Sequence, residues 1–207
     1  HTCALLLSGA VQCWGDNTYG QLGRGTTGLS YDTPQNTSIV LGAVDLTSSN
    51  THSCAVLTNG TVFCWGQNTD GRLGFDSAGV PVNTPTLVPL PAAAQTVRAG
   101  LDHTCALLIT GEVYCWGNNN VGNLGDGTLT ARFAPAKVLG ITSPALVLET
   151  GGQFTCVIAE TDRQLFCWGY NLSIQTTARH YQMTYPVDVE ALVGLKVKDV
   201  SINAISL

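Results

Sequence analysis

Charged side chains are scarce in this sequence. Lys, Arg, Asp and Glu make up 11% of the residues, against roughly a quarter in ordinary globular domains. The nine Lys and Arg residues form no cluster, and the formal net charge is −5. Because a nucleic-acid-binding surface needs clustered positive charge, this composition argues against DNA or RNA as a partner.

Long apolar runs are missing as well. No stretch of the sequence reaches the roughly 18 apolar residues of a membrane-spanning helix, so we expect no membrane span. No signal peptide precedes His1 and the first residue is not methionine, so we interpret the chain as a processed protein or a segment of a longer one. The 3.6-residue period of an amphipathic helix is also missing, which favours an all-β chain.

What the sequence has instead is a repeated unit. Residues 103–125 read HTCALLITGEVYCWGNNNVGNLG, residues 1–23 and 52–74 repeat this pattern, and residues 154–171 (FTCVIAETDRQLFCWGYN) are a degenerate copy. The first cysteine of each unit recurs in steps of 51 residues, at Cys3, Cys54, Cys105 and Cys156. A fixed period of this length is typical of propellers and solenoids.

Each unit is predicted to form one blade of a β-propeller. In the third unit we expect strands at residues 96–99, 104–108, 112–116 and 135–139, with the polar segment 118–132 as a long loop. Four short strands per repeat is the content of a propeller blade. The predicted fold is therefore an all-β propeller domain of four repeats, at about residues 1–51, 52–102, 103–153 and 154–207.

The central hairpin of the unit can be predicted in register. A three-residue loop ending in a glycine with positive φ fits residues 58–60 and sets Cys54 opposite Cys64 on one face. The fourth unit is one residue longer and fits a four-residue loop at 160–163, with the same consequence. We therefore predict four hairpin disulfides: Cys3–Cys13, Cys54–Cys64, Cys105–Cys115 and Cys156–Cys167.

The histidines of the unit raise the question of a metal site. His1, His52 and His103 lie two residues before a cysteine, a pattern that zinc could use. The fourth unit has Phe154 at this position and keeps both cysteines, which favours disulfides and histidines that hydrogen-bond the backbone. We predict no metal and no cofactor.

Catalytic groups are also scarce. The acidic residues form no recurring pair, and no nucleophile lies beside a base in a known motif. We therefore predict no catalytic residues and no enzymatic activity.

The remaining recurrent residues are interpreted as architecture. One tryptophan per unit could stack on a ligand, but its presence in every unit favours packing between blades: Trp14, Trp65, Trp116 and Trp168. The asparagines three residues later and the Gly-x-Leu-Gly motif are typical of turns: Asn17, Asn68, Asn119 and Asn171.

Three glycosylation sequons begin at Asn36, Asn59 and Asn171. Asn59 is the favoured acceptor, because it lies at the predicted hairpin tip.

The unit H-[ST]-C-A-[LV]…G-x-V-x-C-W-G-x-N…G-x-L-G resembles the repeat of the regulator of chromosome condensation over almost the whole chain. This resemblance implies a β-propeller, which has seven blades in members of that family. The cysteine pair departs from the intracellular members and is similar to secreted or cell-surface versions of the repeat. Since disulfides persist in oxidising compartments, we predict a secreted or cell-surface protein.

Two ways of closing the propeller remain open. The sequence starts inside its first unit, without the opening strand of that blade, and a strand predicted near residues 196–201 could supply it. Four blades would then close into a small ring. Alternatively, they are part of a seven-bladed propeller, as the resemblance implies.

The predicted function is that of an extracellular structural or protein-interaction module, part of a larger protein or assembly, with other extracellular proteins or glycans as partners. One alternative, implied by the family's founding member, is a GTPase regulator of the guanine nucleotide exchange factor type. Another is a lectin or enzyme-inhibitor module. Specificity is expected in the loops that differ between units: residues 24–33, 75–84, 126–134 and 173–185.

Overall fold

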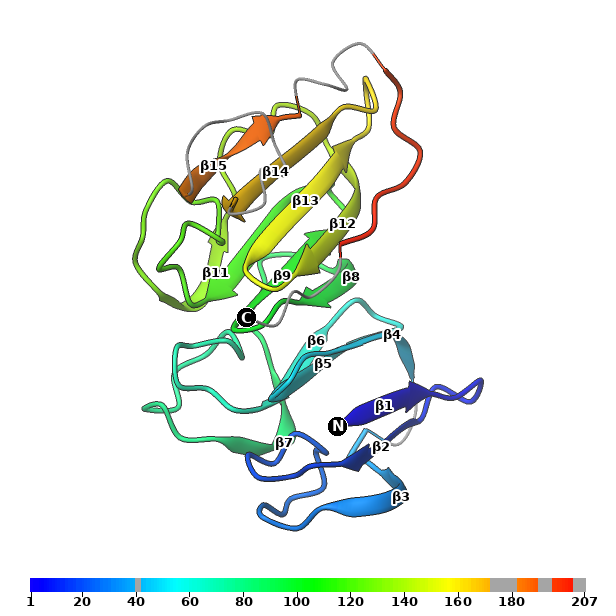
Figure 1. Ribbon diagram of the computed structural model, residues 1–207. Coiled ribbons are helices and arrows are strands. Elements are labelled where there is room, and N and C mark those ends of the chain that lie inside the picture. The colour runs from blue at the N-terminus through cyan, green and yellow to red at the C-terminus, as the bar shows by residue number, and fades with distance from the viewer. Residues whose placement is uncertain (40–41, 172–181, 190–194, 203–207) are drawn as a thin grey trace.

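The computed structural model describes residues 1–39, 42–171, 182–189 and 195–202. In these residues the fold is all β, with fifteen strands in four antiparallel sheets that follow one another along an arc (Figure 1). No helix in the described part of the chain is long and apolar enough to cross a membrane. The prediction of an all-β chain built from blade-like repeats is confirmed.

Each sheet is one blade, with its strands in sequence order. The first blade has three strands: β1 (Thr2–Leu5), β2 (Val11–Gly15) and β3 (Tyr31–Asn36). The second has four: β4 (Ala43–Ser48), β5 (His52–Leu57), β6 (Val62–Gly66) and β7 (Val82–Leu87). The third comprises β8 (Ala94–Ala99), β9 (His103–Leu108), β10 (Val113–Gly117) and β11 (Arg132–Lys137). The fourth comprises β12 (Ala145–Gly151), β13 (Phe154–Ala159), β14 (Leu165–Tyr170) and β15 (Gln182–Asp188).

The inner strands β4, β8 and β12 contact one another in turn around the axis of the arc, and β7, β11 and β15 are the outer strands. The four strands predicted in the third unit are all present, but the outer one begins at Arg132 rather than at residue 135. A bulge between Cys115 and Gly117 shifts the register, so that Gly117 pairs with Arg132 and the strand starts before Pro135.

The hairpin register agrees with the prediction. Cys54 pairs with Cys64, and Gly60 closes the turn with a φ of 78°. In the fourth blade Cys156 pairs with Cys167 across the longer turn. There Arg163 adopts the positive φ of 60° that glycine adopts in the other units.

The hydrophobic core lies between the blades rather than within them. In the first cluster, Val11 and Cys13 of the first blade pack against Ala55 and Trp65 of the second. Two further clusters join the second blade to the third and the third to the fourth in the same way. Each blade therefore depends on its neighbour for burial of its apolar faces, as in other repeat proteins.

Of the two closures that the sequence left open, the four-bladed ring sealed by residues 196–201 is wrong. Residues 196–202 form no strand and do not pair with β1, so the first sheet keeps three strands. Val197 instead donates its N–H to the Arg163 carbonyl of the fourth blade, at 3.0 Å. The four blades follow one another along an arc that does not close on itself (Figure 1). The seven-bladed alternative remains a prediction.

Candidate functional site

The cysteines of each unit are joined to one another. The four pairs predicted from the sequence have S–S distances of 2.08, 2.10, 2.11 and 2.04 Å. No cysteine of the described residues is free. No thiolate is therefore left to bind a metal or to act as a nucleophile, and no group of three or more His, Cys, Asp or Glu in the described part is placed to hold a metal ion.

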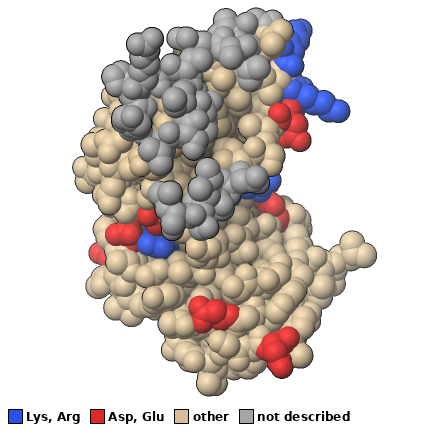
Figure 2. All heavy atoms as spheres, viewed as in Figure 1, with Lys and Arg blue, Asp and Glu red and all other residues tan. Residues whose placement is uncertain are grey.

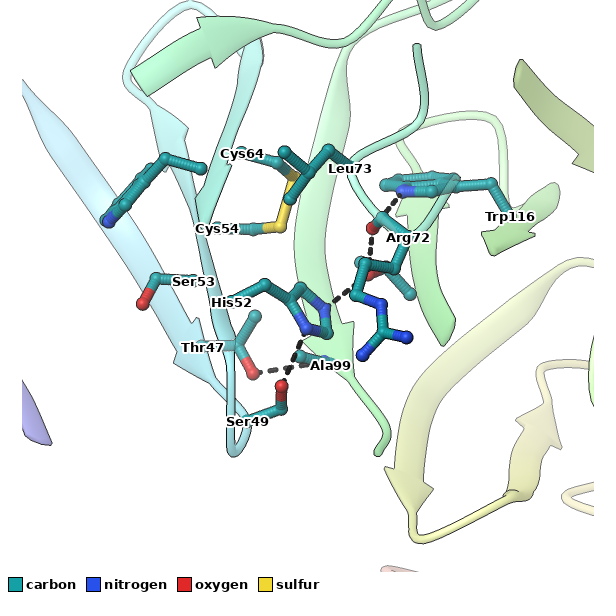
Figure 3. Close-up of a disulfide and its surroundings, with 12 residues drawn as sticks. Thr47, Ser49, His52, Ser53, Cys54, Cys64, Arg72, Leu73, Ala99 and Trp116 are labelled. Carbon is teal, nitrogen blue, oxygen red and sulfur yellow. Dashed lines mark hydrogen bonds between the residues drawn. A yellow bond between two sulfur atoms is a disulfide. The ribbon is translucent and has the colours of Figure 1, made fainter. Parts of the chain in front are cut away.

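The histidines take part in a hydrogen-bond relay between neighbouring blades (Figure 3). His52 Nε2 lies 2.8 Å from Thr104 Oγ1, and Thr104 Oγ1 donates to the Arg72 carbonyl at 2.8 Å. Trp116 Nε1 donates to the same carbonyl at 2.9 Å. Because the Thr104 hydroxyl proton is used in this way, His52 Nε2 must carry the proton of its own bond. His52 Nδ1 then accepts from Ser49 Oγ, at 2.6 Å.

The relay occurs at all three junctions between blades. The other two sets are His1, Ser53, the Gln21 carbonyl and Trp65, and His103, Thr155, the Asn123 carbonyl and Trp168. The prediction that the histidines bond backbone is therefore wrong, since their Nε2 atoms bond a hydroxyl of the next blade. Sequence could not show this, because the partner lies 52 residues away in an adjacent sheet.

Burial fixes the charge state of two of these histidines. His52 and His103 are completely buried. Burial, and then the nearby Arg72 guanidinium, lowers the pKa of His103 to about 3, and the same effects hold the pKa of His52 well below its usual value. Both imidazoles are therefore neutral at physiological pH and serve as fixed hydrogen-bonding groups.

The tryptophans pack between blades, as the sequence predicts. Trp65, Trp116 and Trp168 are completely buried, each against the loop of the preceding unit. Trp14 is only partly buried, because it lies on the face of the first blade that no other blade covers. None of the three buried rings is accessible to a ligand.

The asparagines organise the Gly-x-Leu-Gly loop. Asn68 Oδ1 accepts from Leu73 N at 3.0 Å, and its Nδ2 donates to the Phe75 carbonyl at 2.9 Å. In the first and third units Asn17 and Asn119 likewise accept from the leucine of the motif, and their Nδ2 groups donate to the Thr26 and Thr128 carbonyls. In this conformation the loop presents the Arg72 carbonyl to Trp116 of the next blade. This motif is architecture, as predicted.

In the first three units, the long loops before the outer strands lie on one side of the arc (Figure 1). Residues 24–33, 75–84 and 126–134 each expose one aliphatic side chain: Leu29 at 61%, Val80 at 59% and Leu129 at 47%. In the view of Figure 2, charged residues form only small, separate spots. The fourth loop, 173–185, lies mostly outside the described residues. We call Leu29, Val80 and Leu129 the loop-face residues.

The axis of the arc contains a cavity of about 570 Å³ that the ends of the inner strands line. Arg98 of β8 bonds Asp45 of β4 at 3.0 Å and Glu149 of β12 at 3.1 Å, so it links three blades. Burial alone would lower the pKa of Arg98, but the two carboxylates raise it, and the guanidinium stays charged. This network could not be predicted from the sequence, because the three residues fall in different units and share no motif.

The sequon asparagines differ in exposure. Asn59 is exposed at the hairpin tip, where its Oδ1 accepts from Thr61 N and Thr61 Oγ1. Asn36 is exposed at the end of β3. Asn171 is only 2% exposed, and the rest of its sequon lies outside the described residues. Occupancy remains a prediction, and the exposures favour Asn59 and Asn36.

The repeated unit with this hairpin, relay and loop matches known sequence profiles. A profile described as "Regulator of chromosome condensation (RCC1) repeat" matches residues 59–107 and 110–158. A second profile of the same repeat matches residues 1–21, 43–72 and 95–123. The chain belongs to the RCC1 repeat family. The resemblance noted in the sequence is thereby confirmed.

Among curated relatives, the RCC1 repeats of this chain are similar to the human protein named "Probable E3 ubiquitin-protein ligase HERC4". The two are 29% identical over 174 residues, which is 82% of this chain and 16% of the relative. The chain therefore spans less than a fifth of the length of HERC4. The activity named for HERC4 is therefore not assigned to these repeats.

Several solved structures share the fold. Human WBSCR16 superposes with a TM-score of 0.84 at 22% identity, covering 94% of this chain and 52% of that one. Prp20p from Saccharomyces cerevisiae gives 0.75 at 19% identity, covering 87% and 46%. The ectodomain of the Physcomitrella patens receptor kinase CR4 gives 0.52 at 21% identity, covering 84% and 39%. The chain therefore spans about half the length of WBSCR16 and of Prp20p, and less than half of the CR4 ectodomain.

Proposed function

We propose that this chain is an extracellular structural and protein-interaction module, a disulfide-stapled propeller segment within a larger protein or assembly. The observation that carries the proposal is how the repeat uses its side chains. The recurrent His, Cys, Trp and Asn side chains form disulfides and hydrogen bonds within and between the blades. The loops that differ between units carry the exposed aliphatic residues. A weakly charged surface with exposed apolar groups suits contact with proteins or glycans.

The extracellular part of the proposal rests on the four cystines. Thiols stay reduced in the cytosol and the nucleus, whereas paired cysteines oxidise in the secretory pathway. The similar fold of the CR4 ectodomain supports this location, since that propeller belongs to the ectodomain of a receptor kinase. Thiol counting under denaturing conditions, on protein from its natural source, tests the location. We expect no reactive thiol, and eight reactive thiols would refute secretion.

The interaction part can be tested on the loop face. We expect the triple variant Leu29→Ser, Val80→Ser, Leu129→Ser to lose the partners that the wild-type protein retains from extracellular fluid. Leu7 and Ile109, which are exposed at 111% and 62% on two hairpin tips, provide the matched control. The double variant Leu7→Ser, Ile109→Ser should retain every partner. If both variants bind like the wild type, the loop face is not the contact surface.

A GTPase regulator is the second candidate. The observation in its favour is the similarity to Prp20p, a protein whose reported binding partners are Gsp1p and histones. Stimulated release of labelled GDP from a small GTPase of that class would support this candidate over the first. A lectin would instead be revealed by binding on a glycan array that the loop-face variant loses.

We propose no catalytic reaction for the chain. The ligase activity named for HERC4 is a statement about a protein of which these repeats match 16%. Here the buried, neutral histidines and the oxidised cysteines are fixed in the interfaces between blades. We therefore expect the repeats to bind a partner and to hold it close to the other parts of the larger protein.

A further inference from the structure

A small groove lies beside the hairpin tip of the second blade. It has a volume of about 230 Å³, between the β5–β6 turn and the segment that leads from β7 to β8. One wall of the groove is apolar: Leu87, Pro89, Leu90 and Ala92. Leu87 is 51% exposed, and Asn59 also lines the groove. Apolar side chains that gather in an open groove favour contact with a ligand or a covering group.

The corresponding groove of the third blade, of about 190 Å³, is crossed by an ion pair. Lys137 Nζ lies 2.6 Å from Glu112 Oε1, and both residues line that groove. By strand register Lys137 takes the position of Leu87, and by spacing from the turn glycine Glu112 takes that of Thr61. Leucine and threonine cannot form an ion pair, so the groove of the second blade is left with its apolar wall.

The residue in the place of Glu112 also completes a glycosylation sequon. Thr61 is the third residue of the sequon that begins at Asn59. Its N–H and its hydroxyl both donate to Asn59 Oδ1, at 3.1 and 2.7 Å. Asn59 Nδ2 has no hydrogen-bond partner among the described residues. The nitrogen that N-glycosylation modifies is therefore free, on an exposed residue beside the groove.

The first blade carries a sequon at an equivalent place. Asn36 ends β3 and pairs with Gln12, as Leu87 pairs with Phe63 in the second blade. Asn36 is exposed, and its Oδ1 accepts from Gln12 Nε2 at 2.9 Å. Since Leu87 lines the groove beside Asn59, the two exposed sequons begin at the same end of their blades.

The long variable loops lie at the other end of the strands. In the second blade, β6 and β7 pair from Phe63 with Leu87, near the hairpin tip, to Gly66 with Val82, where residues 67–81 join them. The loop-face residues are therefore on one side of the arc. We call the opposite side, where the hairpin tips and the two exposed sequons lie, the hairpin side.

We propose that Asn59 carries an N-linked glycan whose first sugar covers the groove, and that glycans at Asn59 and Asn36 cover the hairpin side. This inference rests on the proposed secretion. In the modification, Asn59 Nδ2 bonds to the anomeric carbon of the sugar and loses a proton, and the lipid-linked diphosphate of the oligosaccharide donor leaves. The C–H groups and the acetyl methyl of an N-acetylhexosamine pack on Leu87 and Pro89. The loop face stays free of sugar and open to partners.

Occupancy is tested on the chain secreted from a eukaryotic cell line with a cleavable secretion signal, so that the compartment is imposed and the protein surface alone decides. Peptide mass mapping before and after peptide-N-glycosidase treatment should show Asn59 and Asn36 occupied. Thr61→Ala should remove the first glycan and leave the second. Asn171 should stay unmodified, because it follows β14 at the loop end of the strand and is 2% exposed. An unmodified Asn59, or a glycan at Asn171, would overturn the proposal.

Thermal unfolding tests whether the first sugar packs on the groove. All proteins in this experiment carry Asn36→Gln, so that only the Asn59 glycan remains, and an endoglycosidase trims it to one sugar. Relative to the chain made without sugar, this residue should raise the thermal midpoint by about 2–4 °C. Leu87→Ser should remove most of the rise. Leu29→Ser, on the loop face and 61% exposed, is the matched control and should preserve it. The same rise in both variants would refute the packing.

Protein from its natural source separates the glycan from the proposed location. No reactive thiol together with an unmodified Asn59 would overturn the glycan alone. Eight reactive thiols would refute secretion, and the glycan with it. If a chain with unmodified Asn59 retains an extracellular protein that Leu87→Ser releases, the groove is a protein contact surface and the proposal is wrong.

Discussion

The second glycine of the Gly-x-Leu-Gly motif makes the packing between blades possible, and this can be measured at Gly74. This residue has a φ of 82°, and a Cβ built on it would lie 3.0 Å from Trp116 Nε1 and Cε2 and 2.8 Å from Val88 Cγ1. The indole is completely buried and hydrogen-bonded to the Arg72 carbonyl, so it cannot move away without losing that bond. Gly74→Ala should therefore disrupt the junction between the second and third blades.

The expected loss has two parts. An L-residue at a left-handed φ costs about 1–2 kcal/mol. Forcing a methyl group into a filled core costs about 1–3 kcal/mol more. We expect Gly74→Ala to lower the free energy of unfolding by about 2–5 kcal/mol in total, measured by urea denaturation with tryptophan fluorescence and intact disulfides.

Gly79 provides a matched control in the following loop. Its φ is 74°, and the nearest atom that its Cβ would meet is the Thr69 carbonyl oxygen at 4.0 Å. Gly79→Ala therefore carries only the backbone strain, about 1–2 kcal/mol. The difference between the two variants isolates the contact with the indole. Equal losses would refute the idea that this glycine is required by the close approach of Trp116.

Three further predictions follow from the repeated interfaces. Because the folded pKa of His103 is about 3 against an unfolded value near 6.5, the unfolded chain binds more protons between these values, and stability falls as pH is lowered through that range. In this range His103 changes the free energy of unfolding by about 1.4 kcal/mol per pH unit. His103→Phe introduces the residue found at position 154 and should remove this contribution, as measured by urea denaturation at pH 7 and pH 5. The double variant Cys105→Ser, Cys115→Ser releases a short loop and should lower the free energy of unfolding by about 2–3 kcal/mol, with a fall in thermal midpoint that is smaller than the fall caused by reducing all four disulfides of the wild type. Asn68→Ala leaves the buried Leu73 N–H without its acceptor, at a cost of about 1–3 kcal/mol; hydrogen exchange should accelerate in residues 71–77, and the exposed Asn59→Ala should leave it unchanged.

Much of a single blade was predictable because its determinants are local. The cysteine register follows from loop length and the two-residue period of a strand, and the fourth unit, with one more residue, obeys the same rule. The start of the outer strand was misplaced, because a bulge lies between Cys115 and Gly117, at the tryptophan that packs against the second blade. Strand ends next to such irregularities carry no local signal.

The relations between blades were less predictable. The sequence indicated that the tryptophans pack between units, but not that each indole shares a carbonyl with the hydroxyl of its own blade. The Asp45–Arg98–Glu149 network was missed entirely, since it forms only when three inner strands meet at the axis. In one of the two closures left open by the sequence, residues 196–201 seal a small ring, but the structure places Val197 against the fourth blade.

The sequence by itself therefore determined the unit: its period, its hairpin register, its cysteine pairing and the structural role of its recurrent residues. The register and the pairing depend on contacts within about a dozen residues, which spacing and turn chemistry specify, whereas the packing role of the tryptophans follows from their recurrence in every unit. Only the tertiary structure decided the histidine partners, the axial network, the loop face and the position of residues 195–202 against the fourth blade. Those features join residues about 50 positions apart, and the angle between successive blades, which no local pattern encodes, decides which of them meet.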